Sequence, residues 1–86
     1  MTRDTVQSDL FGILLKNFKV DPDVVVDSTP MEQLGLDSLD VIDMIVFIHQ
    51  KFDFRRELND YRAARTLGEL VDFVHSVVNS ADRAPR

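Results

Sequence analysis

Residues 35–40 read GLDSLD and lead into a helical pattern that runs from about Ser38 to Phe52. Aspartate and serine are both favoured at the first position of a helix, so these residues mark a helix start. If Asp37 is the N-cap, Asp40 falls at position N3 in a carboxylate version of the capping box. Ser38 then falls at N1 with no backbone donor to satisfy, and its hydroxyl is predicted to point into solvent.

Ser38 lacks the surroundings of a catalytic nucleophile. Such a serine needs a general base within hydrogen-bond reach and a strained G-x-S-x-G elbow. Here Leu36 and Asp40 replace the glycines, and the two histidines of the chain are His49 and His75. On an ideal helix His49 lies roughly 16 Å along the axis from Ser38, at 1.5 Å per residue. A serine hydrolase is disfavoured and no catalytic residue is predicted; Ser38 is either a plain helix cap or the acceptor of a group that another enzyme attaches.

Four further stretches accompany the DSLD motif at residues 37–40: MEQLGL at 31–36, VIDM at 41–44, FD at 52–53 and TLGELVDF at 66–73. Together they resemble an acyl carrier protein over about residues 6–78. In that family, the serine of a D-S-L motif begins the second helix of a small four-helix bundle. The resemblance implies that a phosphopantetheinyl transferase attaches 4'-phosphopantetheine from coenzyme A to Ser38. It also implies that the arm carries acyl thioesters, while the protein itself catalyses nothing.

The periodicity of apolar residues predicts an all-α fold with four helical segments, a long loop between helices 1 and 2 and a short third helix. The resemblance implies that these segments form a small four-helix bundle. The first helix is expected at about residues 4–18, with Asp4 and Gln7 at capping-box spacing. The third is expected near residues 60–64. The fourth opens with a capping box at Thr66 and Glu69 and continues to about residue 78.

The long loop carries three local predictions. Thr29 has the sequence context of an N-cap for a single turn before Gly35. Gly35 is expected to supply a positive φ or a close approach of the backbone. The three valines at residues 24–26 have no second strand to pair with, so we interpret them as anchors that pack on the bundle.

The helix at residues 38–52 carries more apolar surface than one buried face needs. The stripe expected to face the core consists of Val41, Met44, Ile45, Ile48 and Phe52. A second stripe lies roughly 140° away at 100° per residue, against a usual core stripe a little over 100° wide. We predict that this second stripe, Leu39, Ile42 and Val46, is a docking surface rimmed by Asp37, Asp40 and Asp43. The resemblance implies the same, with ketosynthases and acyltransferases among the partners. The alternative is that further helices bury both stripes, which a chain of this length disfavours.

Composition and charge limit the function classes. The 86 residues allow one domain, expected at residues 1–79, with a disordered tail at residues 80–86. The chain has no cysteine, so neither a disulfide framework nor a thiolate metal site is predicted. No metal site is predicted at His49 or His75 either, because neither has an i, i+4 histidine partner or an acidic cluster to complete one. Residues 1–52 hold four Lys/Arg against nine Asp/Glu, which disfavours nucleic acid and favours partners with basic surfaces. The sequence contains neither a signal-peptide pattern nor a membrane span, so a cytoplasmic monomer is expected.

The end of the second helix departs from the carriers of fatty acid synthesis, which are typically acidic there. This chain has His49, Gln50 and Lys51, followed by Arg55 and Arg56. The acidic strip is cut short, which suggests a dedicated partner set, such as that of a fatty-acid-like, polyketide or polyene pathway.

Two alternatives to the acyl carrier stay open. An aminoacyl or peptidyl carrier shares the bundle and the modified serine. An unmodified helical interaction module would use the second stripe as a plain docking face. Within the helix, Phe47 is expected either to contact the third helix or to add to a binding surface, and Met44 and Ile45 are expected to yield to an acyl chain between the helices.

Overall fold

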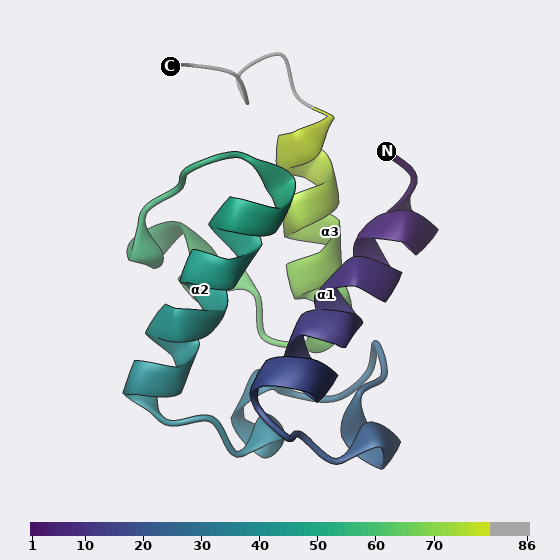
Figure 1. Cartoon of the computed structure of the whole chain (residues 1–86), viewed down its shortest axis with the longest axis vertical. Helices are drawn as coiled ribbons and strands as arrows, with labels where there is room; N and C mark the ends of the chain where they lie inside the picture. Colours follow the sequence, from purple (N-terminus) through teal and green to yellow (C-terminus); the bar gives the residue numbers. More distant parts are fainter. Residues whose placement is uncertain (80–86) are drawn as a thin grey trace.

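The computed structural model describes residues 1–79, and the tail predicted at residues 80–86 lies outside them. The described chain is helical (Figure 1). Its elements are α1 (Arg3–Asn17), η1 (Pro22–Val24), η2 (Met31–Leu34), α2 (Ser38–Phe52), η3 (Leu58–Ala63) and α3 (Leu67–Val78), where η denotes a 3-10 helix. The predicted all-α bundle with a long first loop and a short third helix is confirmed, and η3 is that third helix.

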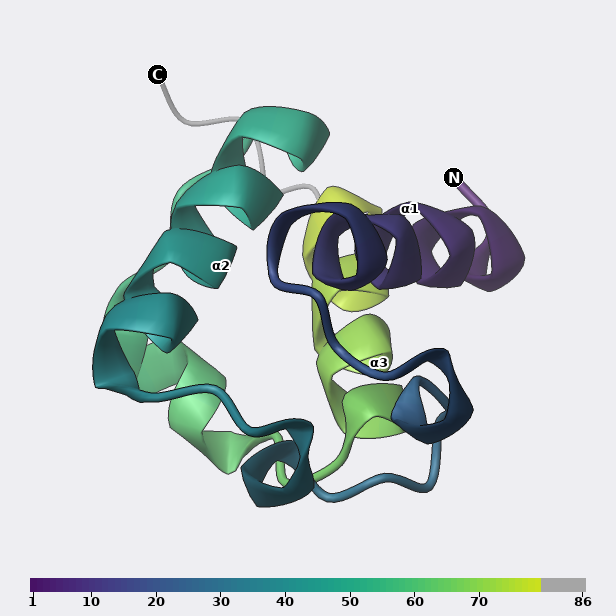
Figure 2. The ribbon, with the colours of Figure 1, turned by 60° about the horizontal axis from the view of Figure 1, so that its bottom comes forward.

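The three long helices enclose one apolar interior. Figure 2 shows α1, α2 and α3 around it, with the segment that carries η3 beside α2. α1 packs mainly against α3 and also against α2. The least exposed side chains come from all three helices: Val6, Leu10, Leu14, Met44, Ile48, Leu67, Leu70, Val71 and Val74. Each contributes roughly 1.5–3 kcal/mol by leaving water, and the entropy lost in ordering the chain opposes this gain.

The start of α1 differs from its prediction. The N-cap is Thr2, whose hydroxyl accepts a hydrogen bond from the Thr5 N–H at 3.2 Å. Asp4 therefore lies in the first turn, where a carboxylate faces the positive end of the helix dipole. The predicted capping box of Asp4 and Gln7 is wrong, because the Gln7 amide donates instead to the carboxylate of Asp27 in the long loop at 2.6 Å.

Arg3 joins the first turn of α1 to two other parts of the chain. Its guanidinium is hydrogen-bonded to the Asp72 carboxylate of α3 and lies 3.2 Å from the Asp27 carboxylate. It also donates to the carbonyl oxygen of Gly68 at 3.2 Å. These partly exposed ion pairs add modestly to stability, but they bring α1, the long loop and α3 to one point.

Backbone hydrogen bonds fasten the long loop to the start of α3. Pro30 and Thr66 form an antiparallel bridge, and beside it the Leu67 N–H donates to the Thr29 carbonyl oxygen at 2.9 Å. The bridge buries Thr29, which is only 7 % exposed. The prediction that Thr29 caps the following turn is wrong, because Pro30 is the N-cap residue of η2 and the turn has no side-chain cap.

The other loop predictions hold in part. Gly35 has a φ of 76°, as predicted. Val25 is buried and Val24 packs against the core, whereas Val26 is 45 % exposed. The interpretation of the valines as anchors is therefore correct for Val24 and Val25. It is wrong for Val26, whose side chain is exposed to solvent after the η1 turn.

The start of α3 has half of its predicted capping box. The Thr66 hydroxyl accepts a hydrogen bond from the Glu69 N–H at 3.2 Å. The Glu69 carboxylate accepts at 2.7 Å from the N–H of Arg65, one residue before the N-cap. The first bond satisfies an N–H group that the helix itself leaves unpaired, and the second fixes the residue that leads into the N-cap.

Two helical glycines offer a matched test of this packing. A Cβ at Gly68 would lie 3.1 Å from the Cβ and the carbonyl oxygen of Asp27, whereas a Cβ at Gly12 would meet no neighbouring segment within 4 Å. We expect Gly68→Ala to lower the free energy of unfolding by about 1–3 kcal/mol, because the loop must shift. Gly12→Ala should raise it by about 0.5–1 kcal/mol, because alanine loses less backbone entropy. Urea unfolding measures both, and shifts of equal sign and size would contradict close packing at Gly68.

Candidate functional site

A reciprocal capping box sets the backbone around Ser38. The Asp37 carboxylate accepts a hydrogen bond from the Asp40 N–H at 2.8 Å, and the Asp40 carboxylate accepts one from the Asp37 N–H at 3.4 Å. Gly35, in the left-handed conformation, turns the chain out of η2 just before this box. The predicted cap is confirmed, and Ser38 is the first residue of α2.

Ser38 is exposed, and within residues 1–79 its hydroxyl has no hydrogen-bond partner. Both neighbouring carboxylates accept backbone hydrogen bonds in the cap. His49 lies eleven residues further along α2 and is hydrogen-bonded to the Tyr61 hydroxyl at 2.8 Å. The structure therefore presents Ser38 as an accessible hydroxyl that no nearby base activates.

Two opposing fields act on a group joined to Ser38. The free N–H groups and the dipole at the start of the 15-residue helix α2 favour an anion there. The carboxylates of Asp37, Asp40 and Asp43 lie along the first turns of the same helix and repel one. An anionic group at Ser38 is thus accommodated near the helix start and turned toward solvent. This arrangement suits a mobile attached group better than a buried one.

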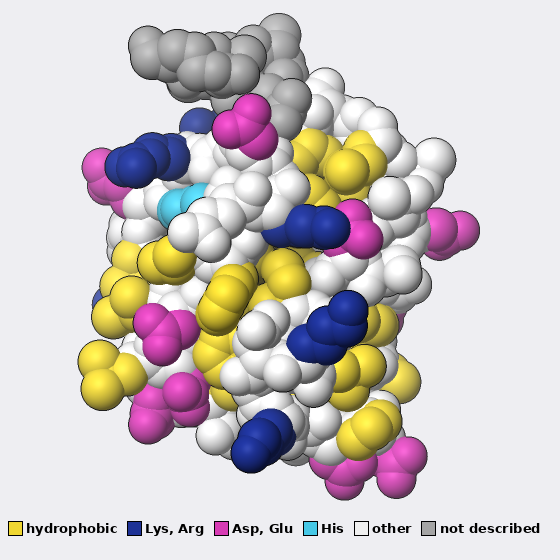
Figure 3. All heavy atoms as spheres, in the orientation of Figure 1, with side chains coloured by type: hydrophobic (Ala, Val, Ile, Leu, Met, Phe, Trp, Pro, Cys, Tyr) yellow, Lys and Arg dark blue, Asp and Glu magenta, His cyan; other side chains and the backbone are white. Residues whose placement is uncertain are grey.

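α2 has two apolar faces, as predicted. The inner face consists of buried or half-buried side chains: Val41, Met44, Ile45, Ile48 and Phe52. On the outer face Leu39, Ile42 and Val46 are 71 %, 45 % and 46 % exposed; we call these three residues the α2 apolar stripe. The alternative in which further helices bury both faces is wrong. Figure 3 shows acidic and hydrophobic side chains side by side over α2.

Phe47 closes the contact between α2 and the end of α1. Its ring packs edge-to-face on Phe18, with 5.8 Å between the ring centroids, and the side chain is 37 % exposed. The expectation of a contact with the third helix is wrong, because Phe47 faces the residue that follows α1. Its partial exposure leaves the other expectation, a binding surface, as a prediction.

An apolar cavity of about 180 Å³ lies between α2 and η3. Its lining comprises Met31, Val41, Met44, Ile45, Leu58, Tyr61, Arg62, Ala64 and Leu70. Tyr61 is buried, Ala64 is half-buried, and Leu58 is largely exposed. Leu58 and Tyr61 share a face of η3, because side chains three residues apart eclipse one another in a 3-10 helix, and Ala64, three residues after Tyr61, is the C-cap residue. That spacing is the sequence signal for this wall; the cavity itself depends on how the segment packs on α2.

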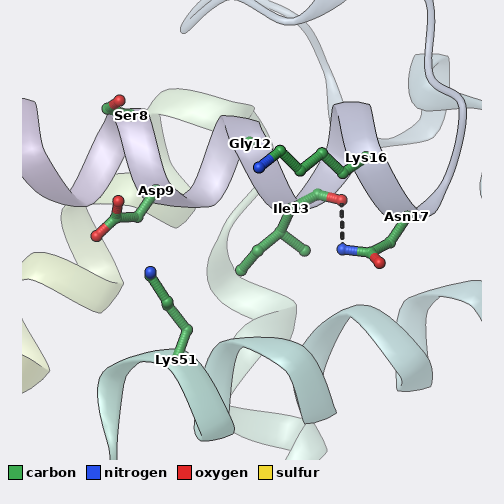
Figure 4. A pocket seen from close by; sticks show the side chains of 7 residues that line it. All are labelled: Ser8, Asp9, Gly12, Ile13, Lys16, Asn17 and Lys51. Carbon is green, nitrogen blue, oxygen red and sulfur yellow. Dashed lines mark hydrogen bonds between the residues drawn. The ribbon is translucent and has the colours of Figure 1, made fainter.

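A separate cleft of about 330 Å³ lies between α1 and the end of α2. Figure 4 shows Lys51 of α2 pointing across it toward Asp9, with Lys16 lying along α1 over Gly12. The cleft is larger than the apolar cavity but is at the opposite end of α2 from Ser38. At this end of α2 the cleft is lined by the cationic side chains of Lys51 and Lys16, whereas Asp37, Asp40 and Asp43 lie toward the other end of the helix.

The described residues form neither a metal site nor a membrane-spanning helix. Within residues 1–79 no cluster of three or more His, Asp or Glu side chains has the arrangement of a metal site. None of the described helices is both long and apolar enough to cross a membrane. His49 and His75 are both half-buried on their helices.

Comparisons with known proteins agree with this geometry. The model of the phosphopantetheine attachment site family matches residues 8–74. An acyl carrier protein of Chlamydia trachomatis serovar L2 is 32 % identical over 87 % of this chain and 99 % of its own length. One from Sulfurovum sp. is 33 % identical over 80 % and 93 %. The crystal structure of an acyl carrier protein from Thermotoga maritima superposes with a TM-score of 0.72 and 27 % identity, covering 86 % of this chain and 87 % of that one.

The cap at Asp37 is a direct target for mutation. We expect Asp37→Ala to lower the free energy of unfolding by about 0.5–2 kcal/mol, because the Asp40 N–H loses its acceptor. Asp37→Asn keeps an acceptor oxygen and should retain most of the stability. Asp43→Ala, on the same helix but outside the cap, is the control and should change stability by less than about 0.5 kcal/mol. Thermal unfolding followed by circular dichroism measures all three, and equal losses for Asp37→Ala and Asp43→Ala would contradict the capping role.

Proposed function

The chain belongs to the acyl carrier protein family, whose members carry phosphopantetheine and do not catalyse, and on that premise we propose that Ser38 is the attachment residue. The observation that carries the proposal is the exposed, unpartnered Ser38 hydroxyl at the capped start of α2. The residues fit the group, since the helix start accommodates its phosphate and the hydroxyl is free to react. We propose residues 1–79 as the carrier domain; its cytoplasmic location and monomeric state stay predictions from composition.

Attachment joins the Ser38 oxygen to the phosphorus at the pantetheine side of coenzyme A. The adenine nucleotide portion leaves, and the hydroxyl proton passes to a base of the phosphopantetheinyl transferase, since this chain offers none nearby. Asp37 and Asp40 hold the serine at the helix start, and their charge turns the phosphodiester toward solvent. When bound, the arm supplies a terminal thiol that holds an acyl group as a thioester.

Intact mass tests the attachment residue. Purified protein incubated with coenzyme A and a phosphopantetheinyl transferase of broad specificity should gain one phosphopantetheine. Ser38→Ala should gain none, because its side chain has no oxygen to attack phosphorus. Ser76→Ala, which removes another exposed serine hydroxyl, is the matched control and should gain one as the wild type does. A gain in folded Ser38→Ala protein would contradict the assignment, and no gain in the wild type would favour the unmodified interaction module.

We further propose that the α2 apolar stripe is the docking surface, with Asp37, Asp40 and Asp43 as its acidic rim. Three exposed apolar side chains on one helix face next to the attachment residue are the support. Apolar contact supplies affinity at such a surface, while the carboxylates orient a basic partner. The partners are the phosphopantetheinyl transferase and acyl-processing enzymes such as ketosynthases and acyltransferases.

Matched truncations test this surface. Ile42→Ala should lower the kcat/KM of the transferase about tenfold, which corresponds to about 1.4 kcal/mol of lost contact. Val26→Ala is the control, because Val26 is as exposed as Ile42, at 45 %, but lies in the long loop. Neither variant should change the unfolding temperature appreciably. Equal loss of activity in the two variants, or none in Ile42→Ala, would contradict docking on the stripe.

The pathway and the cargo are finer parts of the proposal. We propose a dedicated fatty-acid-like, polyketide or polyene pathway, supported by the exposed Lys51 and Arg55 where the acidic strip ends. We also propose that an acyl chain can retreat into the apolar cavity beside η3, where Met44 and Ile45 form part of the lining. Flexible methionine favours such accommodation.

A further inference from the structure

His49 gathers four hydrogen bonds from the segment that follows α2. Its carbonyl oxygen accepts from the N–H groups of Asp53 at 2.9 Å and Phe54 at 3.3 Å. Its Nε2 atom is 2.8 Å from the Tyr61 hydroxyl and accepts from the Arg56 N–H at 3.3 Å. The His49 ring also packs edge-to-face on the Phe54 ring. One residue of α2, through its backbone carbonyl and its side chain, thus holds the chain that leads into η3.

The hydrogen bonds assign the proton state of the His49 ring. Because the Arg56 N–H points at Nε2, that nitrogen presents a lone pair, and in the neutral ring the proton is on Nδ1. The Tyr61 hydroxyl therefore donates to the same lone pair, which the two donors share. Burial raises the pKa of Tyr61 above its usual value, so the phenol keeps its proton throughout the physiological range.

The surroundings oppose a positive charge on His49. Burial lowers the pKa of His49, and the nearby Arg55 guanidinium lowers it further. For Tyr61, the Asp60 carboxylate raises the pKa and the Arg56 guanidinium lowers it. Two further charged residues, Lys51 and Asp53, follow His49 at the end of α2. The α3 residue that packs on Tyr61 is uncharged: it is Phe73, whose ring centroid lies 5.0 Å from that of Tyr61.

Tyr61 connects this polar pair to the apolar cavity, because its side chain is part of the cavity lining. Leu58, Arg62 and Ala64 of the same segment also line it. We propose that neutral His49 is a positioning residue that holds Tyr61 and the segment 54–64 against α2, and that proton uptake by His49 releases this wall of the cavity. We call the contacts of the His49 ring with Tyr61 and Arg56 the latch. Control of acyl cargo through this wall rests on the proposed function, whereas the latch does not.

The direction of the pH dependence follows from the hydrogen bonds. A proton on Nε2 would face the Arg56 N–H donor to donor and leave that N–H without its acceptor, and the Tyr61 hydroxyl would have to turn and accept from Nε2 instead of donating to it. The latched state therefore favours neutral His49, in the same direction as burial and the Arg55 guanidinium, which lower the pKa of His49 below the ordinary 6.5. Stabilisation by the latch is complete above that ordinary value and declines as the pH falls through the lowered one.

Nuclear magnetic resonance of the unmodified protein tests the latch directly, because Tyr61 is the one tyrosine of the chain. The pH is lowered from about 8 to about 5, above the range in which most carboxylates titrate. We expect the Tyr61 ring and Arg56 amide resonances to move with the midpoint of His49, below pH 6.5. In His49→Gln, whose amide oxygen takes the place of Nε2 without titrating, the response should vanish. In His75→Gln it should persist. A response that survives His49→Gln or disappears in His75→Gln overturns the proposal.

Tyr61→Phe provides a second measurement that does not depend on how well His49→Gln folds. This variant keeps the ring and removes the donor to Nε2, so neutral His49 loses stabilisation and its titration midpoint should rise. An unchanged midpoint overturns the proposal.

The effect on cargo is measured on protein loaded with an octanoyl-phosphopantetheine arm. Its melting temperature should exceed that of the unacylated arm-bearing form by more at about pH 8 than at a pH below the His49 midpoint found by nuclear magnetic resonance, where the latch is released. Failure to load Ser38 overturns the proposed function and leaves the latch results standing. Equal acyl-dependent shifts at both pH values overturn control of the cavity by His49.

Discussion

The placement of Ser38 depends on the backbone hydrogen bonds between the long loop and the start of α3. The Met31 N–H donates to the Arg65 carbonyl oxygen at 2.8 Å, and the Gly68 N–H donates to the Asp27 carbonyl oxygen at 2.8 Å. Buried backbone groups must find partners, so these bonds leave the loop few alternative paths. They hold η2, and η2 delivers the chain to the capping box that begins α2. The position of the exposed Ser38 hydroxyl therefore depends on the hydrogen bonds that fix the long loop to the start of α3.

α2 serves three purposes on three parts of its surface. Its first residue offers the hydroxyl, its outer face offers the α2 apolar stripe, and its inner face completes the core. His49 adds a fourth contact, with the segment that carries η3. A small domain has little surface to divide, so the proposed attachment residue, the proposed docking surface and part of the core lie on one helix. The sign of the charge changes along this helix from Asp37 to Lys51.

Several features were predictable because they depend on neighbours within about one helical turn. The capping box at Asp37 is one, since a carboxylate reaches an N–H three residues away whatever the rest of the chain does. The α2 apolar stripe is another, because the helix period separates it from the core face. Asp4 and Thr29 had equally plausible local signatures and failed. Thr2 caps α1 in place of Asp4, and the bridge to α3 draws Thr29 into the interior.

By itself the sequence determined the helices, the carrier family and the exposed hydroxyl of Ser38. Each of these depends on motifs or on the spacing of residues that are close together in the chain. Only the tertiary structure decided that Phe47 meets Phe18, that His49 meets Tyr61, and that a cavity forms beside η3. These contacts join segments twelve or more residues apart. Their geometry depends on how loops place the helices, which periodicity does not encode.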